Sequence, residues 1–237
     1  MNLSRLLLTT ALVVSALPFL ACNNDDNGTP SPATSLFGTF ADESGAAGTV
    51  ELVGTSPAPA SGALLAETEG TPLTGQLRLG GQPSVALTGT LDATAGTISF
   101  GSANGSYALS GLVQANVASG SGTGPGGPAM FALFLGGTPN SVDTFCTIAT
   151  CTDPPRCDTA PAFNFAVEGS DVLATGNVDG TVGVATGTSS ASGVELTIGG
   201  VTANGTITGN ALNGTWTGNG TSGTFAASPS QCLAARR

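Results

Sequence analysis

The chain contains no histidine and no lysine, and its five basic residues are all arginine. Without histidine, the sequence lacks the usual general base and the commonest zinc ligand, and without lysine it cannot form a Schiff base. We therefore predict a protein without catalytic residues, without a cofactor and without a bound metal.

Charged residues are also scarce. They make up 8% of the chain, whereas about 25% is usual in globular proteins. Fifteen acidic residues against five basic ones give a formal net charge of −10. A nucleic-acid-binding surface needs a cluster of basic residues, so nucleic acid is excluded as a partner.

Pairs of carboxylates are the one route to catalysis that the composition leaves open, as in glycosidases. The candidate pairs are Glu67 with Glu69, Asp42 with Glu43, and Asp171 with Asp179. However, the chain has a single Trp and a single Tyr, so these acids lack aromatic platforms for a sugar. Solvated surface acids that keep the protein soluble are the favoured interpretation.

Residues 1–21 have the pattern of a signal peptide. A short segment with one positive charge, at Arg5, precedes an apolar run over residues 6–21. A membrane-spanning helix needs about 20 apolar residues, and Pro18 interrupts this shorter run. The segment therefore predicts export from the cytoplasm followed by cleavage.

The end of this run, Phe19-Leu20-Ala21-Cys22, resembles the lipobox of bacterial lipoproteins, in which a small residue precedes a cysteine. It departs from the usual pattern because Leu is expected in place of Phe19 and a smaller residue in place of Leu20. The resemblance implies that Cys22 becomes an acylated N-terminus that anchors the protein in the bacterial cell envelope. Asn23 after the cysteine resembles an address for the outer membrane. The alternative is an ordinary signal peptide cleaved near Ala21.

Residues 22–35 follow with no apolar run and are rich in Asn, Asp, Gly, Pro and Ser. Such a segment cannot bury enough surface to fold. We predict that it is a flexible tether between the lipidated Cys22 and the first folded residues.

The body of the chain shows apolar residues at every second position. The clearest examples are residues 73–79, 85–91, 163–167 and 194–198. This period predicts strands with one buried face, which is typical of antiparallel sheet. Glycine recurs too often for helices, because it costs about 1 kcal/mol per helical site relative to alanine.

Turn signals of the Asn-Gly, Asp-Gly and Gly-Gly type separate these strands at intervals of about 8–12 residues. Some of these glycines can instead lie within strands and mark bulges. The pattern predicts an all-β fold, a Gly/Thr-rich antiparallel meander that closes into one or two β-barrels, with a β-sandwich as the alternative.

A weak internal repeat indicates two related meanders. Residues 98–131 and 196–225 both pass through Ala-Asn-Gly, at 103–105 and 203–205, and both continue into a Gly-rich hairpin and a Phe-containing strand. At the end of the first repeat, Met130–Leu135 is a run of six apolar residues. It predicts a strand buried on both faces, or one whose outward residues meet the other meander.

The predicted domain organisation follows from the repeat. The first meander or barrel covers residues 36–137, and the second covers 162–237. Residues 138–161 contain three cysteines and several prolines. We predict that this segment is a connector outside both barrels.

Four cysteines remain besides Cys22, and in an exported protein they predict two disulfides. In a closed meander the start of the first strand lies beside the end of the last. If the second meander starts near residue 162, this favours the pairs Cys157–Cys232 and Cys146–Cys151. The alternative pairs are Cys151–Cys232 and Cys146–Cys157.

The end of the second meander, GTITGNALNGTWTGNGTSGTFAA, resembles small bacterial lipocalin-like barrels, although the N-terminal Gly-x-Trp of that family is absent. The resemblance implies a fold only. Trp216 and Tyr107 are the two large amphipathic aromatics. They are interpreted as core residues or, alternatively, as walls of a cavity for a small apolar ligand.

The function predicted from these features is that of a membrane-anchored lipoprotein with a non-catalytic β-domain for structure or interaction. A barrel that binds a small apolar ligand is the alternative, and a carboxylate-based hydrolase is the third hypothesis. The identity of a protein partner or ligand does not follow from the sequence.

Overall fold

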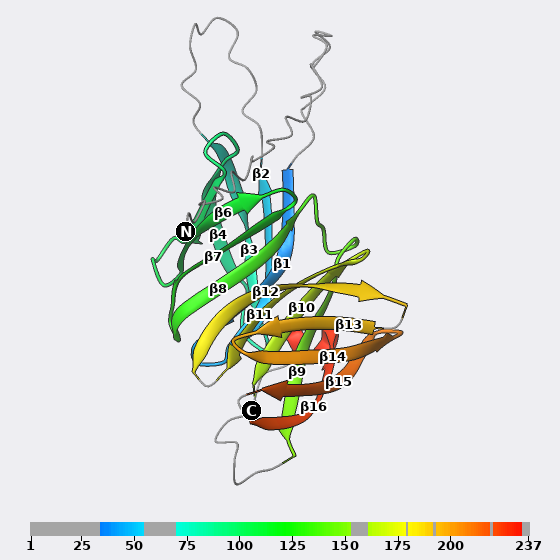
Figure 1. Ribbon diagram of the computed structural model, residues 1–237. Coiled ribbons are helices and arrows are strands. Elements are labelled where there is room, and N and C mark those ends of the chain that lie inside the picture. Colours follow the sequence, from blue (N-terminus) through cyan, green and yellow to red (C-terminus); the bar gives the residue numbers. More distant parts are fainter. Residues whose placement is uncertain are drawn as a thin grey trace, which may run out of the picture.

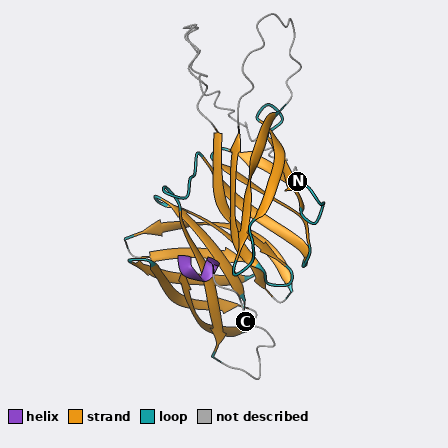
Figure 2. Ribbon diagram, turned by 180° about the vertical axis from the view of Figure 1, so that it is seen from behind, coloured by secondary structure: helices purple, strands orange, loops and turns teal. Residues whose placement is uncertain are grey.

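The computed structural model describes residues 34–54, 70–152, 161–178, 180–191, 193–218 and 220–233. These residues form antiparallel strands that close into two barrels of eight strands each (Figures 1 and 2). The predicted all-β meander and its closure into barrels are confirmed, and the two-barrel form is the one observed. The alternative of a β-sandwich is wrong.

The first barrel is an up-and-down meander in which β1 pairs with both β2 and β8. Its strands are β1 (Thr34–Asp42), β2 (Ala47–Gly54), β3 (Thr71–Leu79), β4 (Val85–Asp92), β5 (Thr97–Ser102), β6 (Ala108–Gln114), β7 (Val117–Gly124) and β8 (Gly127–Leu135).

The second barrel closes where β9 pairs with both β10 and β16. Its strands are β9 (Asp143–Cys151), β10 (Ala162–Glu168), β11 (Asp171–Val178), β12 (Thr181–Ser190), β13 (Gly193–Ile198), β14 (Val201–Thr208), β15 (Ala211–Gly218) and β16 (Thr221–Ser228). The short helix α1 (Pro229–Leu233) follows the last strand. Among the described residues, no helix has the length and apolar character needed to cross a membrane.

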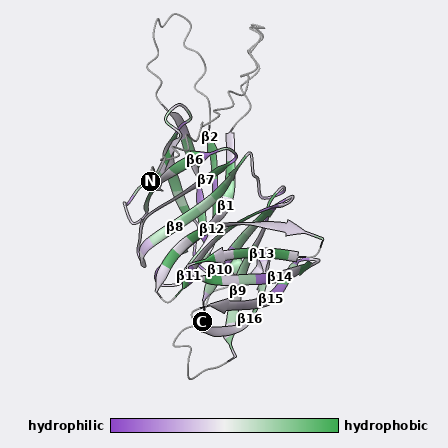
Figure 3. Ribbon diagram, viewed as in Figure 1, coloured by the Kyte–Doolittle hydropathy of each residue, from purple (hydrophilic) through white to green (hydrophobic). Residues whose placement is uncertain are grey.

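Alternation along the strands fills each barrel with its own side chains. In β3, Leu73, Leu77 and Leu79 belong to the core of the first barrel, whereas Thr74 and Arg78 are exposed. Figure 3 shows the same alternation of hydrophobic and hydrophilic residues along many strands. Burial of these apolar side chains is the main favourable contribution to the stability of the barrel.

Aromatic rings occupy much of the second barrel. Phe165 stacks on Phe225, with ring centroids 5.7 Å apart, and Phe163 contacts both rings at an angle. Glycines give these rings room. A Cβ atom on Gly214 would come within 2.6 Å of the Phe225 ring, so a larger residue there would overpack the core.

The predicted connector over residues 138–161 is wrong in part, because it contains β9. This strand is the first of the second barrel in chain order, and it closes the barrel between β10 and β16. Its inward face carries Phe145, Thr147, Ala149 and Cys151, of which only Phe145 is a large apolar residue. The alternation was therefore too weak to detect in the sequence.

The repeated Ala-Asn-Gly does not mark equivalent places. Residues 98–131 and 196–225 do cover the same four successive strands of their barrels, β5–β8 and β13–β16. However, residues 103–105 lie in the turn after β5, whereas residues 203–205 lie inside β14. Gly105 has a positive φ of 70°, as a tight turn requires, and Gly205 instead packs within the sheet.

The two barrels pack directly against each other. Phe37 of β1 and Ala132 and Phe134 of β8 point out of the first barrel and form one buried cluster with Ala166 of β10 and Leu173 of β11. Along the same strand, Phe131 and Leu133 point into the first barrel. The prediction that outward residues of the run 130–135 meet the other meander is confirmed.

Polar contacts extend this interface. The side-chain amide of Asn164 donates a 3.0 Å hydrogen bond to the carbonyl oxygen of Phe40, and both residues are fully buried. The amide of Asn177 donates to the carbonyl oxygen of Glu43 at 2.7 Å near the rim. These directional bonds fix how the barrels meet, because apolar contacts alone do not set orientation.

Candidate functional site

Trp216 lies inside the second barrel and is 2% exposed. It shares its face of β15 with Leu212 and Gly214, and it belongs to the main apolar core of this barrel. Its ring nitrogen donates a 3.0 Å hydrogen bond to the carbonyl oxygen of Thr150 on β9. The ring therefore packs the core and ties β15 to the closing strand.

Tyr107 has a similar position in the first barrel, just before β6. It is 6% exposed and belongs to the core, where its ring meets the ring of Phe40 edge to face at 5.9 Å between centroids. Edge-to-face pairs of this kind add to the stabilisation from burial. Both aromatics that the sequence singled out are thus packed among core residues.

Burial raises the pKa of Tyr107 above its ordinary value of 10.0, and the negative charge of Asp42 raises it further. The folded state therefore prefers the neutral phenol. As pH rises above about 10, the unfolded chain loses the proton first. The free energy of unfolding is then expected to fall with increasing pH. Tyr107 is the only tyrosine, so ultraviolet difference spectroscopy of tyrosinate measures this ionisation directly.

The control for this prediction is Tyr107→Phe, which keeps the ring and removes the ionisable group. Its stability is expected to vary less over the same alkaline range than that of the wild-type protein. An equal alkaline loss of stability in both proteins would contradict the assignment.

Of the candidate carboxylate pairs, only Asp42 with Glu43 lies wholly within the described residues. Asp42 is buried, but its carboxylate accepts bonds from the Ser44 hydroxyl at 2.6 Å and the Ala46 backbone NH at 3.0 Å. It therefore stabilises the turn between β1 and β2. Asp171 is exposed at the start of β11, and Glu67, Glu69 and Asp179 lie outside the described residues.

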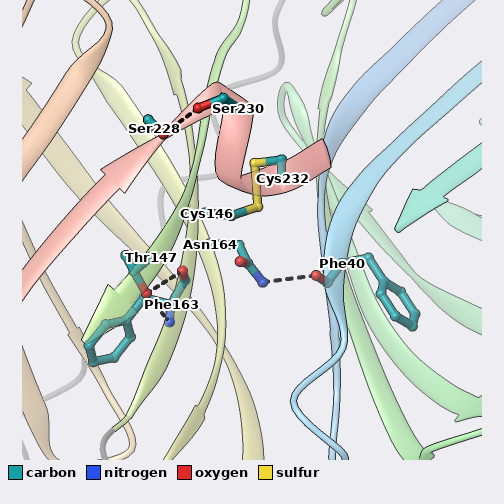
Figure 4. The surroundings of a disulfide bond; sticks show 8 residues. All are labelled: Phe40, Cys146, Thr147, Phe163, Asn164, Ser228, Ser230 and Cys232. Atoms are coloured by element: carbon teal, nitrogen blue, oxygen red, sulfur yellow. Dashed lines mark hydrogen bonds between the residues drawn. A yellow bond between two sulfur atoms is a disulfide. The ribbon is translucent and has the colours of Figure 1, made fainter. Parts of the chain in front are cut away.

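One disulfide joins Cys146 of β9 to Cys232 of α1, with Cα atoms 4.9 Å apart (Figure 4). Both predicted pairings of these two cysteines are therefore wrong. Cys151 is also disulfide-bonded, and Cys157 lies outside the described residues. Two disulfides are predicted among the four cysteines. Because one of them joins Cys146 to Cys232, the second would join Cys151 to Cys157.

The reasoning about barrel closure was sound, but it was applied to the wrong strand. The first strand of the second barrel is β9, and its Cys146 pairs in register with Ser228 at the end of β16. Helix α1 begins at the next residue, Pro229. Cys232 is therefore brought back over Cys146, as expected where first and last strands are neighbours.

Each barrel carries a groove on its surface. A groove of about 320 Å³ crosses β12–β15 of the second barrel. It is lined by residues that include Thr188, Ser190, Glu195, Asn204, Thr206, Asn213 and Thr215. A second groove of about 410 Å³ on the first barrel includes Glu51, Thr74 and Gln76. The sequence interpretation missed these residues, although the outward Thr and Asn positions of each strand were visible in the alternation.

The two remaining predictions concern the lipidation of Cys22 and the absence of a bound metal. Cys22, the predicted lipidation site, lies outside the described residues. Within the part of the chain that the structure describes, no group of three or more His, Cys, Asp or Glu side chains could hold a metal ion.

Comparisons with known proteins give no further assignment. No protein-family model, no curated protein and no solved structure matches the chain.

Proposed function

We propose that the chain is a lipid-anchored protein of the bacterial cell envelope, most consistent with an outer-membrane address, and that its two fused barrels form a non-catalytic domain for structure or interaction. The sequence supports the anchor through the signal-peptide pattern and the lipobox-like residues that end at Cys22. The predicted tether then leads directly to β1, which begins at Thr34.

The observation that carries the second half of the proposal is the packing of the barrel interiors. In barrels that hold a small molecule, the interior is a cavity lined by apolar and aromatic residues. Here Trp216 and Tyr107, which the ligand-binding alternative would place in the wall of such a cavity, pack against other core side chains. This arrangement supports a scaffold that meets its partners with its outer surface.

The outer surface has a definite chemical character. The groove over β12–β15 offers hydroxyl and amide groups and one carboxylate, that of Glu195. Together with the net charge of −10, this supports a neutral, hydrogen-bonding partner over an acidic one, which like charges would repel.

Mass spectrometry of protein purified from its own envelope tests the non-catalytic scaffold against the ligand-binding barrel. The same sample is measured under native and denaturing conditions, so covalent acyl groups contribute equally to both masses. We expect the two masses to agree. A small molecule seen only in the native spectrum would favour the alternative, a barrel that binds an apolar ligand.

Substitution Cys22→Ala tests the anchor. We expect the wild-type protein to carry acyl groups on an N-terminal Cys22, as measured by mass spectrometry of the N-terminal peptide. The variant should carry none, because it lacks the thiol that receives the lipid. It should also accumulate as a longer precursor, since processing of bacterial lipoproteins depends on this residue.

The matched control is Ser31→Ala in the predicted tether, which should be acylated and processed like the wild-type protein. A wild-type protein that begins with an unmodified residue near position 22 would contradict the proposal. It would support an ordinary signal peptide and a secreted domain.

A further inference from the structure

The interface between the barrels contains three buried polar atoms that have no hydrogen-bond partner among the described residues. They are the hydroxyl oxygens of Thr39 and Thr175 and the side-chain oxygen of Asn164. Each of these residues is at most 1% exposed. Buried polar groups in folded proteins nearly always have a partner, so each such atom needs an explanation.

The three residues come from three strands, and each lies on the face that its barrel turns toward the other barrel. Asn164 of β10 and Thr175 of β11 are directly opposite each other in the sheet register, and their chain neighbours Phe163, Phe165 and Ala174 point into the second barrel. Asn164 and Thr175 therefore share the outward face. Directly opposite residues on one face have Cβ atoms about 4.5–5.5 Å apart.

Thr39 approaches from the other barrel. Leu36 and Phe40 of β1 point into the first barrel, and Phe37 points out into the shared apolar cluster. By the same alternation, Thr39 points out. The Asn164 amide bonds the carbonyl oxygen of Phe40, the residue that follows Thr39. Figure 4 shows the Asn164 side chain with its amide nitrogen directed at this carbonyl.

The surroundings close this polar region on both sides. Ala166 and Leu173, two residues away from Asn164 and Thr175, belong to the apolar cluster shared by the barrels. On the other side, Cys146 is opposite Asn164 in the register, and the Cys146–Cys232 disulfide packs against Ala47 of the first barrel. Bulk solvent therefore does not reach the three atoms.

We propose that this interface binds a single buried water molecule that bridges Thr39 Oγ1, Asn164 Oδ1 and Thr175 Oγ1. The amide oxygen can only accept, and each hydroxyl can donate and accept. A water that donates to Asn164 and to one threonine, and accepts from the other threonine, makes three hydrogen bonds. Three is the usual number for a buried water.

The chemistry of the groups favours water over an ion. The three atoms belong to neutral side chains, and the buried carboxylate of Asp42, three residues along β1 from Thr39, accepts bonds from its own turn. The water joins β1 of one barrel to β10 and β11 of the other. Together with the bond from Asn164 to Phe40, it forms a polar contact at the centre of an otherwise apolar interface.

Oxygen-17 magnetic relaxation dispersion of the purified full-length protein counts waters that stay bound for long times. The informative variant is Thr175→Val, which replaces the hydroxyl by a methyl group of similar shape. We expect the dispersion amplitude to fall by the contribution of one water. The control Thr175→Ser keeps the hydroxyl and should keep the wild-type amplitude.

A second variant checks that the lost amplitude comes from the bridging water and not from a change in structure around position 175. Thr39→Val, in the other barrel, should remove the same water, so the double variant should lose no more than either single one. An unchanged amplitude in both single variants would overturn the proposal. So would a crystal structure in which Asn164 Oδ1 bonds a threonine hydroxyl directly, with no water between the three atoms.

Discussion

Replacement of both Cys146 and Cys232 by serine is expected to lower the free energy of unfolding by about 4–5 kcal/mol, on the chain-entropy estimate for a long loop. The two cysteines are 86 residues apart in the sequence, and the bond between them restricts the unfolded chain. It also holds α1 over β9, where Cys232 packs against Ala47 of the first barrel. Urea unfolding of the oxidised proteins at one pH, followed by circular dichroism, measures the loss.

The matched control is the double serine variant of Cys151 and Cys157. If these two form the second disulfide, their loop is short, and its removal is expected to cost only about 2 kcal/mol on the same estimate. Equal losses in both double variants would contradict the assigned roles. No loss in the Cys146 and Cys232 variant would show that this bond does not restrict the unfolded chain.

Without any substitution, trypsin distinguishes the observed Cys146–Cys232 bond from the pairing that the sequence favoured, Cys146–Cys151 with Cys157–Cys232. The chain has arginines at positions 78 and 156, so cleavage separates a peptide that contains Cys146 and Cys151 from one that contains Cys157 and Cys232. With Cys146 bonded to Cys232, the two peptides stay linked until a reductant is added. Their separation without reductant would instead support the pairs Cys146–Cys151 and Cys157–Cys232.

Much of the fold could be predicted because its signals are local. Residues 73–79 and 194–198 alternate strictly between apolar and polar side chains, and they form β3 and β13. Such strands have an apolar face that needs cover, and closure into a barrel supplies that cover. Strand β9 escaped detection because three of its four inward residues are small or polar.

The interface between the barrels was only half predictable. The run Met130–Leu135 is apolar at consecutive positions, and this pattern indicates a strand with two buried faces. Asn164 and Thr175 gave no such signal. Their place in the alternation shows that they point out of their barrel, but it does not show that another barrel covers them. Contacts between segments far apart in the sequence are not contained in a period of two.

The sequence singled out Trp216 and Tyr107 but left two roles open for them, core packing and the wall of a ligand cavity. Trp216 and Tyr107 stand out in the sequence because each is the only residue of its type. Rarity does not distinguish a ligand-binding ring from a core ring. That distinction depends on what fills the space around the ring, which neighbouring strands decide.

Replacement of Trp216 by alanine is expected to lower the free energy of unfolding by about 3–5 kcal/mol, the usual cost of removing a large aromatic side chain from a core. Trp216 is 2% exposed, and a Cβ atom on Gly223 of β16 would come within 2.5 Å of its ring, so the space is tightly filled. The hydrogen bond to the Thr150 carbonyl is lost as well. Urea unfolding followed by circular dichroism measures the change.

Trp216→Phe serves as the control, because it keeps an aromatic ring in the core and removes the ring nitrogen. We expect its loss to be clearly smaller than that of Trp216→Ala. If Trp216 were instead the wall of a ligand cavity, its removal would enlarge a space that already exists, and the alanine variant would lose little stability. A loss of less than about 1 kcal/mol, well below the usual range for a core aromatic, would therefore argue against the packed-core role and favour the ligand-binding barrel.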